Sequence, residues 1–412
     1  MAPIFDGNLR HFSEKPGGLK VDDFYGDTVA NYFISHAHTD HFEGLKEFQD
    51  ILRDRSNDSV IYCTKETGEL IMSRVGYKRE ILSNKFRYKA VGERFSLRHR
   101  ENGVSDTTVE FARANHLPGA VMMLFKDKHY KALYTGDFRF ESYERSEVTN
   151  EMKSFLENTT DIDILYLDIT CLDLLGERKG DKNKFPCKRI ILEEIADMVS
   201  TLTENSDSSE RSNDEDECNS EDRPDSEGFD SEGSGVGGPD SYKNVHVDCS
   251  ALGWQEVAKH LADQFDSSLG ICPKDPKKKL HQCIVELLSG DVKIETPHKS
   301  FVHNSNGADC KYCTDRTIRI KPSLKWLFYE LEGYSYKQST WIREKDPVEE
   351  PGFFNVLYSL HSSHYELQQF MKLLNLSRKA EIFPISRPLG ENIEGMSNNE
   401  VRSKTKELFK KW

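Results

Sequence analysis

The chain has 412 residues, of which 36% are hydrophobic, and a net charge of −14. This length allows two domains, or one large domain that carries an insertion. No apolar run approaches the ~20 residues that a membrane-spanning helix needs, and residues 1–12 lack the basic and apolar pattern of a secretory signal. Nine scattered cysteines, an odd number, are typical of a protein from a reducing compartment.

The negative charge is concentrated in one segment. Residues 204–240 hold 14 acidic side chains and only two arginines, which accounts for −12 of the net charge of −14. Because residues 204–242 are rich in Ser, Asp, Glu and Gly, we expect a disordered, solvated insert. A mimic of nucleic-acid charge, or a phosphorylation target, is the less favoured interpretation. The rest of the chain is nearly neutral, so its acidity does not exclude a protein that binds phosphate through metal ions.

The first 170 residues are expected to form short strands with turns and helices between them. Apolar, β-branched and aromatic residues mark the strands, and most of these runs end at Gly, Asn, Asp or Ser. The expected strands are Val29–Ser35, Ser59–Cys63, Thr107–Ala114, Ala120–Phe125, Lys131–Thr135 and Ile162–Leu167. Helical patterns cover Glu66–Val75 and, further on, Lys188–Leu202. This alternation predicts a layered α/β fold.

Regular elements resume after the acidic segment. The expected strands are Val245–Cys249, Thr317–Ile320, Phe353–Ser359 and Ala380–Ile385. The expected helices are Gly253–Phe265, Lys279–Leu288, Tyr365–Leu374 and Asn399–Lys410. The sequence shows no internal repeat, which argues against a repeat architecture.

Four potential metal ligands lie within six residues, directly after the apolar strand residues 32–34. In His36-Ala37-His38-Thr39-Asp40-His41, extended backbone places His36 and His38 on the same face, so both can bind one metal ion. Asp40 and His41 follow a turn and can reach a second ion. Imidazole and carboxylate together suit Zn²⁺. The alternative is a surface cluster of His and Asp, but this spacing at the end of an apolar strand is rare by chance.

Two further candidates at strand ends complete a site for two ions. His116 follows the strand at 107–114, and Asp137 follows the strand at 131–135. Binding residues concentrate in such loops, although a lone His or Asp there is more often structural. Because Asp137 has two carboxylate oxygens, it can bridge two ions. The expected ligands are His36, His38, His116 and Asp137 for the first ion, and Asp40, His41 and Asp137 for the second. A metal pair of this kind is typical of enzymes that displace a group at phosphorus.

These motifs resemble those of the metallo-β-lactamase proteins, in the form found in the DNA cross-link-repair nucleases of the β-CASP subfamily. The matching segments are His36–His41, His116-Leu117-Pro118-Gly119 and Tyr134-Thr135-Gly136-Asp137-Phe138-Arg139. The resemblance runs from about residue 5 to about residue 390, apart from the acidic segment, and favours the Artemis branch of this family over its close relative, the Apollo branch. It implies a four-layer αβ/βα metallo-β-lactamase fold with an inserted α/β β-CASP domain. The implied boundaries are 1–170 and 351–412 for the metallo-β-lactamase domain and 171–350 for the insertion.

Three more segments match the same family and imply roles for their residues. Tyr166-Leu167-Asp168-Ile169-Thr170 places Asp168 beside the metals, and Tyr358–Ser363 makes His361 a general acid that protonates the leaving 3′ oxygen. Val21–Phe24 makes Asp22 a residue that orients a metal-bound histidine. We count Asp40, Asp137, Asp168 and His361 among the catalytic residues. Thr39, Ser362, Ser363 and Lys321 are candidates for contacts with phosphate. Judged by the residues alone, His361 would more often be a structural histidine.

The resemblance implies a nuclease with one tightly bound Zn²⁺ and a labile second site that Mg²⁺ or Mn²⁺ can fill. RNA-cutting relatives carry a further histidine where this chain has Ile385, so DNA is the favoured substrate. Single-stranded ends, overhangs and hairpins, a nuclear location and a role in double-strand-break or cross-link repair, with proteins of repair complexes as partners, follow from the family. RNA processing, a small-molecule hydrolase and a scaffold with a decayed site are the alternatives. The choice between exonuclease and endonuclease stays open.

A second, structural zinc site is also expected from the cysteines of the insertion. Cys310-Lys311-Tyr312-Cys313 is a Cys-x-x-Cys pair, with Cys272, His298 and His303 upstream. These residue types can complete a tetrahedral site. The family has a small zinc site in this region, but its usual histidine aligns with Glu295 here. Reduced free cysteines are the alternative.

Overall fold

A computed structural model describes most of the chain. The described residues are 18–54, 56–99, 103–141, 147–175, 185–204, 242–273, 275, 277–288, 293–295, 297, 300–305, 310, 313–324, 341–345, 350–390, 393, 395–410 and 412. Most of the acidic segment, and His298, lie outside them. In this part of the chain, the structure has no helix with the length and apolarity to cross a membrane.

Two sheets form the first unit of the molecule. A four-stranded parallel sheet has the order β1 (Leu19–Val21), β2 (Asn31–Phe33), β3 (Val60–Cys63) and β4 (Phe86–Tyr88). A six-stranded sheet has the order β17 (Leu376–Pro384), β9 (Ile162–Leu167), β8 (Lys131–Tyr134), β7 (Val121–Lys126), β6 (Gly103–Arg113) and β5 (Arg94–His99). Strands β5 to β8 run antiparallel, whereas β8, β9 and β17 are parallel.

The two sheets face each other across a dry core. Val21 and Phe33 from the four-stranded sheet share one buried cluster with Phe125 and Tyr166 from the six-stranded sheet. The rings of Phe33 and Phe125 meet edge to face, with centroids 5.0 Å apart. Alternating side chains on each strand supply this face, because successive residues of a strand point to opposite sides of its sheet.

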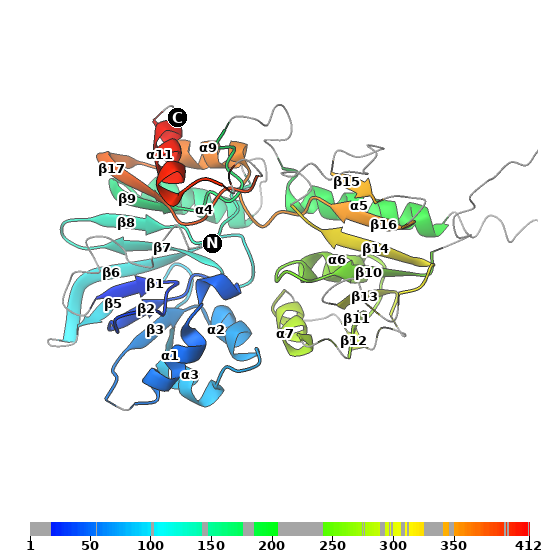
Figure 1. Ribbon diagram of the computed structural model, residues 1–412, viewed down its shortest axis with the longest axis horizontal. Coiled ribbons are helices and arrows are strands. Elements are labelled where there is room, and N and C mark those ends of the chain that lie inside the picture. The colour runs from blue at the N-terminus through cyan, green and yellow to red at the C-terminus, as the bar shows by residue number, and fades with distance from the viewer. Residues whose placement is uncertain are drawn as a thin grey trace, which may run out of the picture.

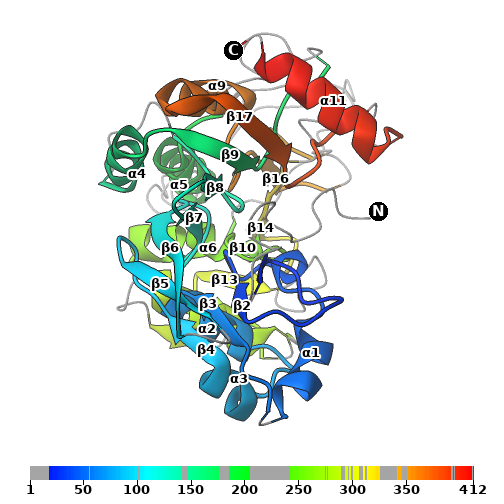
Figure 2. The same ribbon diagram turned by 90° about the vertical axis from the view of Figure 1, so that its left-hand side faces the viewer.

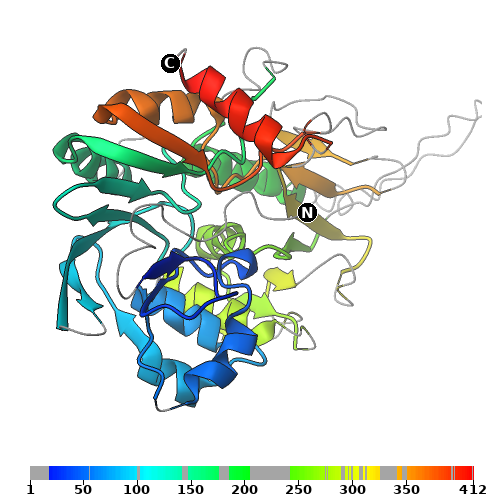
Figure 3. The same ribbon diagram turned by 60° about the vertical axis from the view of Figure 1, so that its left-hand side comes forward.

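Helices cover the outer face of each sheet and complete four layers (Figure 2). On the four-stranded sheet lie α1 (Leu45–Leu52), α2 (Lys65–Met72) and α3 (Arg79–Lys85). On the six-stranded sheet lie α4 (Glu147–Asn158), α9 (His364–Leu373) and α11 (Asn398–Phe409). Figure 3 shows α11 lying along β17, so the last helix of the chain packs on the first unit. The arrangement confirms the four-layer metallo-β-lactamase architecture expected from the sequence.

A seven-stranded sheet forms the second unit (Figure 1). Its order is β12 (Ile294–Glu295), β11 (Leu269–Ile271), β13 (Val302–Ser305), β10 (Asn244–Asp248), β14 (Thr317–Pro322), β16 (Phe353–Val356) and β15 (Ile342–Glu344). All neighbours are parallel except β15 and β16. Helices α5 (Lys188–Glu204), α6 (Gln255–Gln264) and α7 (Lys278–Leu288) belong to this unit.

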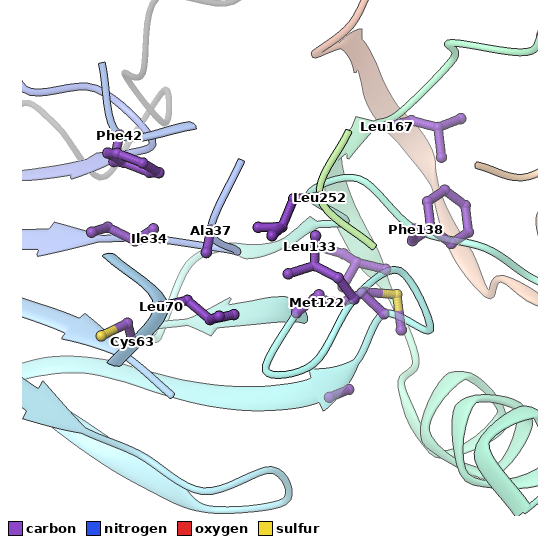
Figure 4. Close-up of a cluster of buried hydrophobic side chains, with 14 of the residues drawn as sticks. Ile34, Ala37, Phe42, Cys63, Leu70, Met122, Leu133, Phe138, Leu167 and Leu252 are labelled. Carbon is purple, nitrogen blue, oxygen red and sulfur yellow. The ribbon is translucent and has the colours of Figure 1, made fainter. Parts of the chain in front are cut away.

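The chain crosses between the two units twice. It passes to the second unit between β9 and α5, and it returns between β16 and α9. The sequence places the end of the insertion at residue 350. We propose that the insertion begins at 171 but ends after β16, because β16 pairs with β14 and β15. The units also share packing: Figure 4 shows Leu252, from the loop after β10, beside Ala37 and Leu133 of the first unit.

Candidate metal centre at the domain junction

The first histidines leave the four-stranded sheet directly after β2. Ile34 and Ala37 are fully buried in the core. Between them, Ser35 donates a hydrogen bond to Asp22 and His36 faces His38. His38 keeps extended backbone, with φ −75° and ψ 144°, and a short 3₁₀ turn at Thr39–His41 follows. The alternation predicted from the sequence therefore holds up to His38, and the turn then redirects Asp40 and His41.

Three imidazoles and one carboxylate converge on one point. His38 Nδ1 lies 2.9 Å from His36 Nε2 and 2.9 Å from His116 Nε2. Asp137 Oδ2 lies 3.5 Å from His36 Nε2 and 3.6 Å from His116 Nε2. The four donor atoms all lie within 4.8 Å of one another. Nitrogens this close need a shared cation or protons between them, and three nitrogens with one oxygen suit zinc.

The outward-facing nitrogen of each imidazole is held by a partner. His36 Nδ1 lies 2.9 Å from Ser35 Oγ, and His116 Nδ1 lies 2.7 Å from the carbonyl oxygen of Leu360. His38 Nε2 lies 3.0 Å from the carbonyl oxygen of Leu252. Since each carbonyl accepts an N–H, the opposite nitrogen is left with its lone pair directed at the cluster. Leu252 and Leu360 lie on segments of the domain junction, so both units orient this group.

Burial keeps these histidines in the form that binds metal. Burial is the largest influence on His36, His38 and His116, and it lowers the pKa of each imidazole; for His36 and His116 the pKa falls well below 6.5. All three are therefore neutral near pH 7. Neutral imidazole is the form that coordinates a metal ion.

Tight loops bring His116 and Asp137 to the same point. Asn115, at φ 51°, adopts the left-handed conformation that asparagine tolerates, just before His116. Gly136 has φ 53°, and a Cβ there would lie 2.8 Å from Ser35 Cβ. Only glycine lets the loop before Asp137 approach the histidine motif this closely.

A second group of donors adjoins the first through Asp137. Asp137 Oδ1 lies 3.4 Å from His41 Nε2, and Asp40 Oδ2 lies 3.7 Å from the same nitrogen. The two oxygens of Asp137 thus face the two groups, as expected for a bridging carboxylate. The side chain of Asp40 is 78% exposed, so this half of the site is open to solvent. Burial lowers the pKa of His41, but Asp137 and Asp22 outweigh burial and raise it well above 6.5.

Asp22 is the hub of a hydrogen-bond network behind His41. Its Oδ2 lies 2.8 Å from His41 Nδ1 and accepts hydrogen bonds from Ser35 Oγ at 2.6 Å and Tyr134 Oη at 2.8 Å. Its Oδ1 accepts the Ser35 amide at 2.8 Å. This geometry fits the orienting role expected for Asp22. The sequence did not single out Ser35 or Tyr134, since a serine and a tyrosine at strand ends carry no local signal of such a role.

His361 and Asp168 form a pair on the other side of Asp137. His361 Nδ1 lies 2.8 Å from Asp168 Oδ2, and His361 Nε2 lies 4.0 Å from Asp137 Oδ2. Burial lowers the pKa of the His361 imidazole, but Asp168 and Asp137 outweigh it and raise the pKa to about 9. Asp168 is itself fixed, because its Oδ1 accepts hydrogen bonds from Thr170 Oγ1 and Ser386 Oγ, each at 2.6 Å. In the metal-free site, Asp168 and Asp137 therefore favour the protonated form of His361, whose Nε2 faces Asp137.

The expected phosphate contacts divide into two groups. Ser362 and Ser363 are buried: Ser362 Oγ donates to the Phe138 carbonyl oxygen at 3.1 Å, and Ser363 Oγ caps α9 by accepting the Glu366 amide at 3.2 Å. These hydroxyls have no access to a phosphate, which corrects the expectation from the sequence. Thr39 is exposed and accepts a hydrogen bond from Arg74 Nη1 at 3.1 Å. Lys321 lies on β14, opposite Asn355 of β16.

A cavity of about 210 Å³ opens beside the metal-ligating residues. His38, Thr39 and Asp40 line one side of it, and Ser250 and Lys277 of the second unit line the other side. Arg74 also lines this cavity, so two basic side chains lie beside the carboxylates of the site. Among the four donors of the first group, His38 lines this cavity.

A separate cluster of metal-ligating residues lies in the seven-stranded sheet. His246 of β10 is the register partner of His303 of β13, and their ring centroids are 5.0 Å apart. Cys313 Sγ lies 3.7 Å from His303 Nε2. The donor atoms of His246, His303, Cys310 and Cys313 lie within 4.8 Å of one another. Burial, and next His303, lower the pKa of His246 to about 4, so its imidazole is neutral.

This cluster changes the ligand set expected from the sequence. His303, Cys310 and Cys313 are in the group, but Cys272 is not, and His298 lies outside the described residues. His246 completes the group instead. His246 comes next to His303 only because β10 pairs with β13, and no local sequence pattern indicated this pairing.

Comparisons with known proteins give one matching family model and several relatives. A family model described as DNA repair metallo-beta-lactamase matches residues 300–384. The chain is 32% identical to protein Artemis of Gallus gallus over 405 residues, which cover 94% of this chain and 48% of that protein. It is 29% identical to the DNA cross-link repair protein PSO2/SNM1 of Saccharomyces cerevisiae over 186 residues, covering 43% and 25%. It is 34% identical to the 5′ exonuclease Apollo of Danio rerio over 147 residues, covering 35% and 22%.

The chain thus spans about half the length of the Gallus gallus relative and about a quarter of the other two. A solved structure of a protein of unknown function from Enterococcus faecalis V583 matches 91% of this chain and 80% of that chain, with a TM-score of 0.52 and 12% identity. This likeness supports the fold.

Proposed function

We propose that the chain is a metal-dependent nuclease of the DNA repair metallo-β-lactamase type, which hydrolyses phosphodiester bonds in DNA; the match of residues 300–384 to that family model and the similarity to Artemis over 94% of the chain support this. One observation carries the proposal. Four metal-ligating atoms, from His36, His38, His116 and Asp137, converge at the domain junction, and the His361–Asp168 pair lies directly beside them. A metal group with an adjacent proton donor suits the hydrolysis of a phosphate ester.

The residues present fit a zinc ion at the first group and a more weakly held ion at the second. The first group is buried and has four donors, whereas Asp40 and His41 form an open half-site that shares Asp137. When bound, such ions polarise a phosphoryl oxygen and supply a nucleophile near neutral pH. We propose one tightly bound Zn²⁺, with Zn²⁺, Mg²⁺ or Mn²⁺ at the labile position.

His361 is the proton donor in this proposal. Its Nδ1 is held by Asp168, so its Nε2 is the nitrogen that faces the cluster. With a pKa raised to about 9, it carries the proton needed at pH 7. The oxygen of a water molecule bonds to phosphorus and the water releases a proton to solvent; as the bond from phosphorus to the 3′ oxygen breaks, Nε2 gives its proton to that oxygen. The products are a 3′-hydroxyl and a 5′-phosphate.

DNA is the proposed substrate, and RNA is the second candidate. Ile385 follows β17 and packs partly buried against the core between the two sheets, where RNA-cutting relatives would carry a further metal-ligating histidine. An apolar side chain there supports DNA and a weak second ion. Arg74 and Lys277, beside the cavity, are suited to phosphate contacts along a single strand. A nuclear role in double-strand-break or cross-link repair belongs to the same proposal.

We also propose a structural zinc ion at the separate cluster in the seven-stranded sheet. His246, His303, Cys310 and Cys313 offer two imidazoles and two thiols, the donor set of many closed tetrahedral sites. His303 Nε2 lies 3.7 Å from Cys313 Sγ, so this imidazole faces a thiol of the cluster. Zinc at this cluster would tie β10 and β13 to the loop at Cys310 and Cys313.

The proposal is tested with purified protein on matched substrates. We would compare 5′-phosphorylated single-stranded DNA, a DNA hairpin with an overhang, and RNA of the same sequence, each with and without a chelator. Cleavage of DNA that the chelator abolishes is the expected result. A ladder from the 5′ end would identify an exonuclease, and internal cuts near the hairpin or overhang would identify an endonuclease. Cleavage of RNA alone would contradict the choice of substrate, and no cleavage with Zn²⁺, Mg²⁺ or Mn²⁺ would contradict the proposed function.

A further inference from the structure

One buried arginine holds both segments that connect the two units. Arg139 lies two residues after Asp137, and 1% of it is exposed. Its Nη1 donates to the carbonyl oxygen of Ser359 at 2.7 Å, and its Nη2 donates to the carbonyl oxygen of Pro186 at 2.6 Å. Pro186 lies just before α5, where the chain enters the second unit, and Ser359 lies just after β16, where it leaves. A single guanidinium therefore joins the two crossings.

The guanidinium keeps its charge in this buried place because two carboxylates flank it. Glu366 Oε1 lies 3.5 Å from Arg139 Nη2, and Glu141 Oε1 lies 3.7 Å from Arg139 Nε. Burial lowers the pKa of Arg139, but Glu366 and Glu141 outweigh it and raise the pKa above its ordinary value. Breaking such a buried charge network is costly, so the arrangement is held in one geometry.

The carboxylates extend the network to the residues of the candidate site. Glu141 accepts the Lys188 amide at 2.6 Å and the side-chain amide of Asn115, the neighbour of His116, at 3.1 Å. Glu366 Oε2 accepts the Ser363 amide at 2.7 Å. The guanidinium thus anchors the loops that carry His116 and His361.

His361 is fixed on both sides by this same region. The His361 amide donates to Ser359 Oγ at 3.0 Å, and Ser359 Oγ donates back to the His361 carbonyl oxygen at 2.7 Å. On the other side, the Ser362 amide donates to the Phe138 carbonyl oxygen at 3.0 Å. The Ser359 carbonyl that Arg139 holds is thus two residues before the imidazole.

We propose that Arg139 is a positioning residue: by joining both crossings, it sets the place of His361 Nε2 relative to Asp137 and so the transfer of a proton to the leaving oxygen. The inference rests on the proposed function, in which His361 is the acid. A displacement of about 1 Å at a reacting group can cost roughly 10²-fold in rate. Arg139 is not one of the metal-ligating residues. Its direct hydrogen bond towards the site is to the Ser359 carbonyl, two residues before His361, whereas it reaches the loop of His116 only through Glu141.

The test uses two leaving groups. Cleavage of DNA expels a 3′ oxygen that needs a proton, whereas cleavage of the 4-nitrophenyl ester of thymidine 5′-phosphate expels nitrophenolate, which needs none. We would measure kcat and KM of the wild type, Arg139→Lys, His361→Ala and the double variant on both substrates, together with bound zinc and melting temperature. Lysine keeps the charge but cannot donate to two carbonyls in the planar geometry of arginine. Arg94→Lys, at an exposed arginine paired with Glu110, is the matched control.

The expected result is a selective loss. Arg139→Lys should lower kcat on DNA by roughly 10- to 100-fold, leave kcat on the nitrophenyl ester within about twofold of the wild type, and add little to His361→Ala. Equal losses on both substrates, or unchanged kcat on DNA, would overturn the inference while leaving the proposed function intact. An inactive wild type would overturn both.

A second variant keeps the test valid if Arg139→Lys does not fold. If Arg139→Lys loses its zinc or its cooperative melt, Glu141→Gln, which loosens the same guanidinium while keeping it, should show the same selective loss on DNA. A Glu141→Gln variant that is slowed equally on both substrates would contradict the positioning role.

Discussion

The two clusters of metal-ligating side chains use similar residues in different surroundings. The cluster at the domain junction adjoins a cavity of about 210 Å³, an exposed Asp40 and the protonated His361. The cluster of His246, His303, Cys310 and Cys313 lies between two paired strands and a loop, with a buried Cys310 and thiols in place of carboxylates. A metal that performs chemistry needs an open position and neighbouring acids or bases, whereas a structural metal needs a closed set of four donors. The role of each metal site therefore depends on the residues and the solvent access around the metal-ligating side chains, as well as on those side chains.

Removal of one imidazole from the junction cluster should have the largest effect. In His116→Ala, the four-donor group loses Nε2, and the neutral imidazoles of His36 and His38 lose a partner in binding the ion. We expect loss of tight zinc binding and DNA cleavage reduced to the level of the chelated protein. Metal content by mass spectrometry and cleavage of hairpin DNA measure both. A variant that keeps full activity would show that the junction cluster is not the catalytic centre.

Removal of the proton donor should reduce turnover and spare the metal. His361→Ala deletes the imidazolium beside Asp137 but none of the four donors of the first group. We expect kcat on DNA to fall by roughly 10²- to 10⁴-fold, the range for a general acid, with zinc content unchanged. Steady-state kinetics with metal analysis checks this. Loss of zinc in this variant would make His361 a metal ligand instead.

Loss of the residue behind His41 should have a smaller effect, confined to the open half-site. Asp22→Asn can keep the hydrogen bond from the Ser35 amide to Oδ1, but an amide nitrogen in place of Oδ2 no longer accepts a hydrogen bond from His41 Nδ1. We expect affinity for the second ion to fall by roughly 10- to 100-fold, with the first zinc retained. Titration of Mn²⁺ into zinc-loaded protein measures it, with Asp23→Asn, the neighbouring acid, as the matched control. An equal loss of both ions would show that the two groups are not separable.

The affinity of the same half-site for the second ion should depend on pH. In the metal-free protein the pKa of His41 is raised well above 6.5, so an ion must displace a proton from His41 at neutral pH. Affinity for the second ion should therefore fall as the pH decreases below that pKa, by about tenfold per pH unit for one displaced proton. Calorimetry in buffers of different ionisation enthalpy would count the released protons. Affinity independent of pH between 6 and 8 would contradict the protonated state of His41.

Disruption of the closed cluster should affect stability and leave the chemistry intact. Cys313→Ser removes one thiol from the group of four. We expect one zinc fewer per chain and a melting temperature lower by several degrees, as for a structural site. The kcat of the folded fraction on DNA should remain within about twofold of the wild type, because the cluster belongs to the seven-stranded sheet, whereas the proton donor lies in the loop before α9. Unchanged zinc content would show that these side chains hold no metal.

The sequence predicted the catalytic half of this comparison better than the structural half. His36, His38 and His41 lie in one short motif after a strand, and His116 and Asp137 follow strands that the pattern also indicated, so local rules were sufficient. The strands β2, β3, β6 to β10, β14, β16 and β17 and the helices α2, α5, α6, α7, α9 and α11 lie within or close to the expected ranges.

What the sequence missed depends on contacts between distant segments. His246 joins His303 only because β10 pairs with β13, and the carbonyls of Leu252 and Leu360 reach the histidines only across the domain junction. Ser362 is a candidate for contact with phosphate in the sequence, yet the fold buries it against the carbonyl group of Phe138. The strands β1, β4, β5, β11, β12, β13 and β15 and the helices α1, α3 and α4 were not expected. Packing in the fold, rather than a local sequence pattern, can stabilise such elements.

The measurement that bears most directly on the central claim compares wild type and Asp137→Asn on a 5′-phosphorylated DNA hairpin with an overhang, with zinc content determined on the same samples. The substitution keeps the size of the side chain but removes the charge that both metal groups share. We predict that the wild type cuts the DNA and that Asp137→Asn loses both its zinc and its cleavage while keeping its fold. Undiminished cleavage by Asp137→Asn would contradict the account, because the chemistry would then lie outside the junction cluster.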